Sequence, residues 1–303
     1  MNKKDQGWLN LYKPKNISSF LALKKIKNKF NIPKIGHAGT LDPLAEGVLP
    51  IALGKTTKLI PFVNFNLKNY IFTIKWGEQT STDDTEGNII NKSSKVPNDI
   101  EIKQSFKNFL GFIEQVPPNA SAVKFNGERA YKLLRSKKKF DLKSKKVFLK
   151  SIKILKKSSE RHTTFTIECG KGFYVRSLAR DLAQSLGTFG HITYLNRTKV
   201  GFFSNKTAIL LDELLKIGQT DFEFNCIHSS MSMLDDILAY EIEEKKDFED
   251  LAFGKSIRID KKKLIKPPLN LDKKNTVFLS KKGNIISFGK LNGDLFKPNK
   301  ILI

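Results

Sequence analysis

Cysteine and long apolar segments are both scarce in this sequence of 303 residues. The two cysteines, Cys169 and Cys226, are too few for a disulfide framework, which is typical of a reducing compartment. The longest apolar stretches, such as residues 47–53, fall far short of the roughly 20 residues that span a membrane. The first fifteen residues also lack the apolar centre of a secretory signal. We therefore expect a soluble, cytoplasmic protein with no membrane partner.

Only part of a nucleotide-binding P-loop is present. Gly54-Lys55-Thr56 matches the end of that motif, but the glycine that should begin it is replaced by Leu49. Pro50 also removes a backbone N–H that a phosphate cradle would use. These departures argue against nucleotide hydrolysis.

Motifs for metal centres and hydrolase sites are missing as well. The four histidines are scattered, and neither cysteine lies at ligand spacing from one of them, so we expect no metal. There is no Gly-x-Ser-x-Gly nucleophile elbow. Asp42 and Glu46 are the only local pair of carboxylates for a glycosidase, and we interpret them as one buried and one solvated acid.

Arginine is rare, although the protein is strongly basic. The chain has 54 lysines and arginines against 30 acids, a net charge of +24, yet only seven of the basic residues are arginines. Such a surplus predicts a polyanionic partner, most commonly nucleic acid, although a lysine-rich coding composition would also produce it. Because lysine cannot replace a guanidinium fork, the few arginines are the informative basic residues.

The charge is also unevenly distributed. Residues 132–157 carry 12 basic side chains and a single acid, whereas residues 212–250 have a net charge of −9. The second stretch would repel RNA or DNA, so we expect it off the binding face or at a domain boundary.

Apolar periodicity predicts strands and helices in mixed order. One helix is expected over residues 20–30, capped by Ser18 or Ser19, with Phe20, Leu23, Ile26 and Phe30 on one face. A second is expected over residues 174–186, and a shorter one ends at residues 106–110. Strands are expected at residues 8–12, 70–76, 147–155, 163–168, 276–279, 285–288 and 300–303. Without regular βαβ alternation this pattern indicates an α+β fold, followed by a small β-rich block from about residue 240.

The most informative segment is residues 36–59, GHAGTLDPLAEGVLPIALGKTTKL, in which Asp42 lies between two apolar runs. This string resembles the signature of the TruB family of tRNA pseudouridine synthases. Five further motifs of that family occur in the expected order along the chain: Lys13-Pro14, the Gly77-x-x-Thr-x-Thr-x-Asp84 run after Tyr70, residues 116–124 (VPPNASAVK), residues 171–178 (KGFYVRSL) and residues 190–197. The resemblance covers roughly residues 8–235.

This resemblance implies a pseudouridine synthase fold with a central mixed or antiparallel sheet flanked by helices. Residues 1–237 would form the catalytic domain and residues 238–303 a small PUA-like RNA-binding domain. The implied reaction is the isomerisation of uridine-55 in the T loop of tRNA to pseudouridine. The implied protein is a monomer with no cofactor and no obligatory protein partner. The isomerisation moves no electrons in or out, so it needs no redox cofactor.

The resemblance also implies the site residues. Asp42 would be the nucleophile, and whether it attacks uracil C6 or ribose C1′ stays open. Tyr70 would stack on the flipped-out base as an exposed aromatic, and His37 would fill the vacated space or contact its phosphate. The substrate-binding residues implied in this way are His37, Tyr70, Tyr174, Arg176 and Leu195.

A carboxylate that stays ionised in a dry pocket requires a cation, and Arg176 matches the family's arginine. We expect Arg176 to hold Asp42 through two parallel hydrogen bonds. Arg180 lies one helical turn further on, and we expect it farther out, near phosphate or solvent.

Two positions depart from the family pattern. Asn16 stands where the family has glycine after Lys-Pro-x, and asparagine is the next-best residue for a left-handed turn. Glu46 replaces a small or hydroxylic residue. Two other functions remain open: an RNA chaperone that folds tRNA without chemistry, and a relative that modifies ribosomal or guided RNA.

Overall fold

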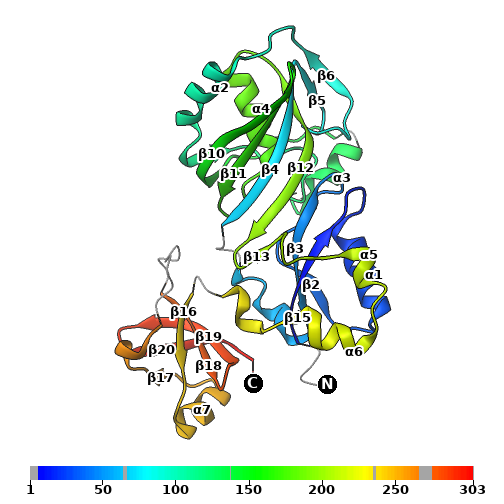
Figure 1. Ribbon diagram of the computed structural model, residues 1–303. Coiled ribbons are helices and arrows are strands. Elements are labelled where there is room, and N and C mark those ends of the chain that lie inside the picture. Colours follow the sequence, from blue (N-terminus) through cyan, green and yellow to red (C-terminus); the bar gives the residue numbers. More distant parts are fainter. Residues whose placement is uncertain (1–5, 64–66, 137, 235–236, 266–274, 303) are drawn as a thin grey trace.

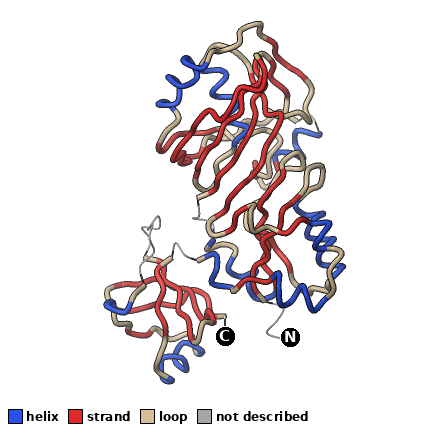
Figure 2. Tube along the Cα trace, in the orientation of Figure 1, coloured by secondary structure: helices blue, strands red, loops and turns tan. Residues whose placement is uncertain are grey.

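The computed structural model describes residues 6–63, 67–136, 138–234, 237–265 and 275–302. Figures 1 and 2 show a long body built on one continuous sheet, with a smaller β-rich unit beside its lower end. Within the described residues, no helix is long and apolar enough to cross a membrane.

The main sheet has 11 strands and mixed strand directions. Eight strands form its path in the order β14-β1-β3-β12-β4-β11-β10-β7, while β2, β13 and β15 pair at its margins. The strands are β1 Gly7–Lys13, β2 Ile35–His37, β3 Glu46–Leu53, β4 Lys68–Trp76, β7 Gly111–Gln115, β10 Lys145–Ser159, β11 His162–Cys169, β12 Gly190–Val200, β13 Phe203–Ser204, β14 Ile209–Leu210 and β15 Ile227–His228. Two small hairpins stand apart from it: β5 Glu78–Thr80 with β6 Ile89–Lys92, and β8 Lys124–Phe125 with β9 Glu128–Arg129.

Strand β12 joins the two halves of this sheet. It runs antiparallel to β4 over most of its length and touches β3 in parallel only at Asn196 and Arg197. Beyond these residues β3 and β12 diverge, and the loop that precedes β3 lies next to this point. The expected α+β fold with a mixed central sheet is therefore confirmed.

Both faces of the lower half of the sheet are buried, which explains its long apolar run. Alternate residues of β3 belong to two different cores: Leu49 and Ile51 pack on one face, and Val48 and Ala52 on the other. A strand covered on both faces has no polar side and reads as one uninterrupted apolar stretch.

Helices cover the sheet in two groups (Figure 1). The α-helices are α1 Ser19–Lys29, α2 Asp99–Ser105, α3 Ala130–Arg135, α4 Val175–Ser185, α5 Leu211–Leu214, α6 Gln219–Asp221 and α7 Lys245–Ala252. Short 3₁₀ or π turns occur at η2 Gly54–Leu59, η4 Phe106–Asn108, η5 Phe222–Cys226, η6 Ser230–Met233 and η7 Lys261–Lys263. Helix α4 confirms the prediction over residues 174–186, and η4 ends the expected short helix.

Helix α1 begins as the sequence predicts, but one of its expected core residues is wrong. The Ser18 side chain accepts a hydrogen bond from the backbone N–H of Leu21, which caps the helix. Leu23, Ile26 and Phe30 are buried, whereas Phe20 is 74% exposed. Helical spacing defines a stripe without fixing its edges, and here the small residues Ser19 and Ala22 take the inner side.

The smaller unit is a five-stranded sheet in the order β16-β18-β19-β20-β17. Its strands are β16 Leu238–Glu241, β17 Ile257–Arg258, β18 Thr276–Lys281, β19 Asn284–Asn292 and β20 Leu295–Ile301. The expected β-rich C-terminal block is thus confirmed, although its last strand begins five residues earlier than predicted, and Ile303 lies outside the described residues. The strongly acidic stretch, residues 212–250, includes the connection from the main sheet to the smaller one.

The two sheets share an apolar cluster, in addition to the core that the smaller sheet has to itself. Phe288 of β19 is fully buried and stacks on Phe62 of the main body, with ring centroids 3.9 Å apart. The same cluster contains Trp8 of β1 and Val48 of β3. The C-terminal sheet is therefore packed against the outer face of the main sheet rather than tethered by a linker.

We predict that Gly47→Ala is destabilising, because it changes the residue at which β3 and β12 meet. Gly47 has φ +109°, and a Cβ there would lie 2.3 Å from the carbonyl oxygen of Arg197. We expect a loss of about 2 kcal/mol or more in the free energy of urea unfolding. Gly218→Ala is the control, since Gly218 has φ −77° and open space around it. Its change should stay within about 0.5 kcal/mol, and equal effects at both positions would contradict this account.

Candidate active site

A cavity of about 290 Å³ opens where the loop before β3, the start of β4, the start of α4 and strand β12 meet. This volume is near the lower limit for pockets that bind small molecules. Five of the six site residues expected from the sequence line it: Asp42, Tyr70, Tyr174, Arg176 and Leu195. Other residues of the wall include Gly39, Lys68, Ser121, Lys171 and Arg197.

The loop that carries Asp42 is anchored on both sides of this residue. The Ser19 hydroxyl donates to the carbonyl of Leu41 and accepts from its N–H, both at 2.9 Å. On the other side, the N–H of Asn16 donates to the carbonyl of Pro43 at 2.8 Å. Asn16 has φ +65°, which confirms the left-handed turn expected there. Leu41 is buried in the core, so Asp42 has little freedom to move.

The Arg176 side chain connects Asp42 to a second carboxylate. Its Nη2 lies 2.8 Å from Asp42 Oδ2, and its Nη1 lies 3.1 Å from Asp84 Oδ2. The pairing with Asp42 agrees with the sequence-based hypothesis, but the two parallel bonds do not form. The fork instead gives one nitrogen to each carboxylate, because Asp84 of the motif after Tyr70 occupies its other side.

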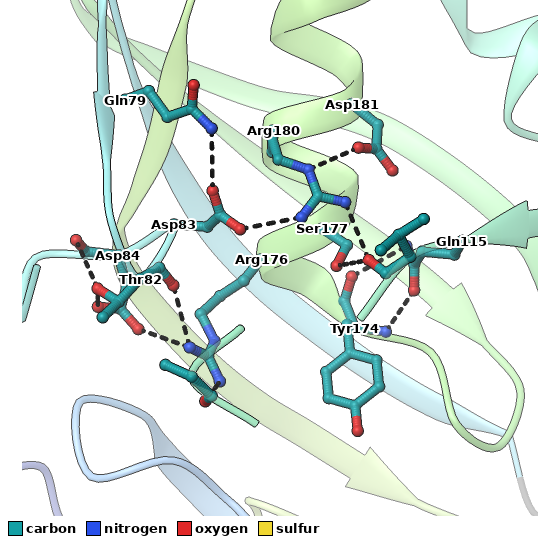
Figure 3. Close-up of polar contacts among 12 residues, drawn as sticks. Gln79, Thr82, Asp83, Asp84, Gln115, Tyr174, Arg176, Ser177, Arg180 and Asp181 are labelled. Carbon is teal, nitrogen blue, oxygen red and sulfur yellow. Dashed lines mark hydrogen bonds and ion pairs between the residues drawn. The ribbon is translucent and has the colours of Figure 1, made fainter. Parts of the chain in front are cut away.

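Arg176 and Asp84 are both held by further hydrogen bonds (Figure 3). Arg176 donates to the carbonyls of Thr82 and Ala120, each at 3.1 Å. Asp84 accepts from the Thr82 hydroxyl at 2.5 Å and from the N–H of Glu86 at 2.9 Å. Burial alone would lower the pKa of Arg176, but Asp42 and Asp84 outweigh it and the pKa is raised. The guanidinium therefore remains charged.

Arg180 does not reach solvent, so the expectation of a solvent-facing side chain is wrong. Its side chain is only 15% exposed and pairs with Asp83 at 3.1 Å and Asp181 at 2.8 Å (Figure 3). It also donates to the carbonyl of Val116. These contacts fix α4 against neighbouring loops, and they leave Arg180 without a role at the cavity.

Gln115 sets the start of α4. Its amide accepts from the N–H of Tyr174 at 2.8 Å and donates to the carbonyl of the same residue at 3.1 Å (Figure 3). The Ser177 hydroxyl adds a bond to the carbonyl of Val116 at 2.7 Å. The side chains of Tyr174 and Arg176 therefore enter the cavity from a fixed helix end.

Tyr70 forms part of the cavity wall, but it is only 7% exposed rather than the open aromatic that the sequence suggested. Burial raises its pKa, and the charge of Arg197 opposes that rise. Burial also raises the pKa of Tyr174, with a further contribution from Asp42. Both phenols are therefore neutral at physiological pH.

His37 is the expected site residue that does not line the cavity. It lies at the end of β2, opposite Ile51 of β3, and its Nδ1 is buried with no hydrogen-bond partner in the part of the chain that the structure describes. Burial and the charge of Arg197 lower its pKa. His37 is therefore a neutral side chain beside the Asp42 loop.

The two local acids differ from expectation as well. One buried and one solvated acid were expected, but both are partly exposed. The Asp42 side chain is 35% exposed. Glu46 is half-buried and accepts hydrogen bonds from Tyr194 Oη at 2.9 Å and Asn196 Nδ2 at 3.4 Å. Among the residues that the structure describes, no three His, Cys, Asp or Glu side chains gather as metal ligands.

Sequence reasoning left two buried cations near the Asp42 loop without a role. Arg197 donates to the carbonyls of Gly39, Thr40 and Val48, at 3.0, 3.4 and 2.8 Å. Lys13 is fully buried and donates to the carbonyls of Pro14 and Ile17; burial lowers its pKa to about 8, against the influence of Asp42. The rarity of arginine was the signal that could have singled out Arg197.

Two family models match consecutive parts of the chain. Residues 27–175 match the model described as TruB family pseudouridylate synthase (N terminal domain), and residues 176–239 match the tRNA pseudouridylate synthase B C-terminal domain. A protein of Ehrlichia ruminantium named tRNA pseudouridine synthase B is 50% identical over 209 residues, covering 69% of this chain and 71% of that protein. A protein of Caulobacter vibrioides with the same name is 43% identical over 251 residues, covering 83% and 81%.

Solved structures support the fold. A chain from a crystal structure of a Cbf5–Nop10–Gar1 complex superposes with a TM-score of 0.75 at 22% identity, covering 99% of this chain and 86% of that one. A chain from an H/ACA ribonucleoprotein bound to a substrate RNA gives 0.72 at 20% identity. The fold is thus that of pseudouridine synthases. By its sequence, this chain belongs to the TruB family of pseudouridylate synthases.

We predict that Asp84→Ala lowers the free energy of unfolding by about 3 kcal/mol, because it leaves the buried Arg176 guanidinium without one of its two carboxylates. Asp84 is 1% exposed at its side chain. The matched control is Asp294→Ala, which removes an exposed carboxylate 3.5 Å from Arg258 and should cost less than about 0.5 kcal/mol. Urea unfolding at neutral pH checks both variants. A small loss of unfolding free energy for Asp84→Ala would contradict the view that both carboxylates stabilise the buried Arg176.

Proposed function

We propose that this protein converts a uridine of tRNA, uridine-55 of the T loop, into pseudouridine, with Asp42 as the nucleophile. The observation that carries this proposal is the Asp42–Arg176 pair, 2.8 Å apart in a nucleotide-sized cavity. The names of the relatives support tRNA as the substrate, and the net charge of +24 suits a polyanion.

The chemistry requires one attacking carboxylate and no change of oxidation state. Asp42 adds to uracil C6 or to ribose C1′, and the N1–C1′ bond breaks. The uracil turns, C5 bonds to C1′, and the bond that Asp42 had formed breaks, which regenerates the carboxylate. The proton on C5 leaves and N1 takes one up. Asp42 suits this role because, among the described residues, it is the only carboxylate on the cavity wall, and about one third of its side chain is accessible.

The target base has to leave its stack to reach Asp42. Tyr70 offers an aromatic surface for the extruded uracil, and such stacking is worth roughly 1–3 kcal/mol per base. Tyr174 and Leu195 complete the walls. We further propose that the C-terminal sheet, in residues 238–303, is a PUA-like RNA-binding unit, and that His37 contacts the RNA beside the vacated position.

We predict that Asp42→Asn abolishes turnover while RNA binding persists, because the amide keeps the shape of the side chain without its attacking charge. Pseudouridine at position 55 can be mapped in tRNA incubated with each protein, with binding measured in parallel. Conversion at the wild-type rate by Asp42→Asn would rule out this nucleophile. Binding without conversion by the wild-type protein would favour a tRNA-folding role, and conversion only in ribosomal RNA would favour a different substrate.

We predict that Arg176→Lys impairs turnover more than RNA affinity. An ammonium cannot bridge Asp42 and Asp84 as the guanidinium fork does, so Asp42 would stay charged but lose its alignment. Misplacement by about 1 Å can cost on the order of a hundredfold in rate.

The same change one turn further along α4, Arg180→Lys, is the control, since Arg180 contacts neither Asp42 nor the cavity. It should reduce stability with much less effect on rate. Single-turnover kinetics with unmodified tRNA distinguishes the two variants. Equal losses of rate, or a pure binding defect in Arg176→Lys, would refute the alignment role.

A further inference from the structure

Cations outnumber acids on the cavity wall, and some of them lack acidic partners. Arg176 is matched by Asp42 and Asp84. Lys68 and Arg197 line the same cavity, but no described carboxylate lies within 4 Å of either. Arg197 donates its N–H groups to the carbonyls of Gly39, Thr40 and Val48, which do not cancel its charge. The free protein therefore holds uncompensated positive charge beside Tyr70.

The fold brings these two cations to one point. Lys68 and Tyr70 are two residues apart on β4, so their side chains leave the same face of the strand. Arg197 is the direct cross-strand partner of Tyr70 on β12. A methyl group built on Gly39 would lie 3.6 Å from Arg197 Nη1 and 3.9 Å from Lys68 Nζ. Both charges thus border the same small volume next to the Asp42 loop.

The protonation of Lys68 reflects this unbalanced environment. Burial, with the positive charges of Arg197 and Lys171, lowers its pKa to about 8, and Cys169 acts in the opposite direction. Burial raises the pKa of Cys169 to about 12, so this thiol carries no charge near neutral pH. An arriving anion would relieve the repulsion between Lys68 and Arg197 and hold the lysine in its charged form.

The chemistry of the proposed substrate identifies that anion. Uracil and ribose are neutral, and the phosphodiesters on either side are the anionic groups of the nucleotide. Resting on the proposed function, we propose that Lys68 and Arg197 form a subsite for one phosphodiester flanking the target uridine. This subsite would hold the backbone of the flipped nucleotide while its base lies on Tyr70.

The position of Lys68 relative to Asp42 favours the backbone over the reacting atoms. Asp42 forms its ion pair with Arg176, at 2.8 Å. The Lys68 ammonium lies on the Gly39 side of the cavity, 3.9 Å from a methyl group built on that glycine. A group placed there contributes to affinity and positioning rather than to bond making.

The test compares the wild-type protein and Lys68→Met, each with unmodified RNA hairpins and with hairpins in which a neutral methylphosphonate replaces the phosphodiester 5′ or 3′ of the target uridine. Single-turnover kinetics gives the half-saturating RNA concentration and the maximal rate. We expect Lys68→Met to raise the half-saturating concentration about tenfold or more, as for loss of a charged hydrogen bond, with little change in maximal rate. The methylphosphonate at one linkage should weaken wild-type binding similarly and have no further effect on Lys68→Met.

Three variants sharpen the result. Lys199→Met removes the same charge from an exposed position on β12, and should weaken binding to all hairpins equally and modestly. Lys68→Arg should retain most of the affinity. In the free protein, Lys68→Met should not lower the melting temperature, because it removes an unpaired charge beside Arg197. If it nevertheless fails to fold, the wild-type response to the two neutral linkages decides alone.

Independent penalties at both linkages, insensitivity of the wild-type protein to either, or a loss confined to the maximal rate would overturn the subsite. Conversion of the unmodified hairpin by the wild-type protein tests the proposed function separately from the subsite. Failure at that step contradicts the proposed function, whereas failure of the linkage cycle alone contradicts only the subsite.

Discussion

The Arg176 guanidinium is the interaction on which the geometry of the cavity depends. It joins the start of α4 to the Asp42 loop, to the turn at Thr82 and Asp84, and to the segment ending at Ala120. A buried cation is costly unless it is paired or hydrogen-bonded, and Arg176 has two carboxylates as close partners. If Asp42 forms a covalent bond as proposed, it loses its charge, while Asp84 still matches Arg176. The cation can therefore stay in place through a step that removes one of its partners.

The remaining contacts separate the residues that hold the cavity from those that face into it. Ser19, Gln115 and Arg197 bind backbone atoms of the surrounding loops and give the cavity its shape. Asp42 and Tyr70 project from that frame into the space it encloses. Preorganisation of this kind is needed where the reacting atoms must meet within a fraction of an ångström.

Local periodicity was sufficient for the strands around Tyr70 and for helix α4, because their apolar patterns reflect the face that each buries. The residues that line the cavity were predicted from a family resemblance, because no pattern within one segment indicates that Asp42 faces Arg176. The errors have one physical origin. Whether Phe20 is covered, whether Arg180 reaches solvent and whether Arg176 has a second carboxylate all depend on segments distant in the chain. Lys68 gave no sequence signal in a chain so rich in lysine.

The apolar core shared by Phe62 and Phe288 has a consequence for how the molecule unfolds. Detaching the C-terminal sheet would expose both stacked rings, together with the outer faces of Trp8 and Val48 in the main sheet. The smaller sheet also has a core of its own, which includes Val277, Leu279 and Phe296. The shared cluster couples the two sheets, so that damage to it affects the strands that lead to the Asp42 loop. We expect the two sheets to melt in a single cooperative transition, as one folding unit despite their separate hydrogen-bonded ladders.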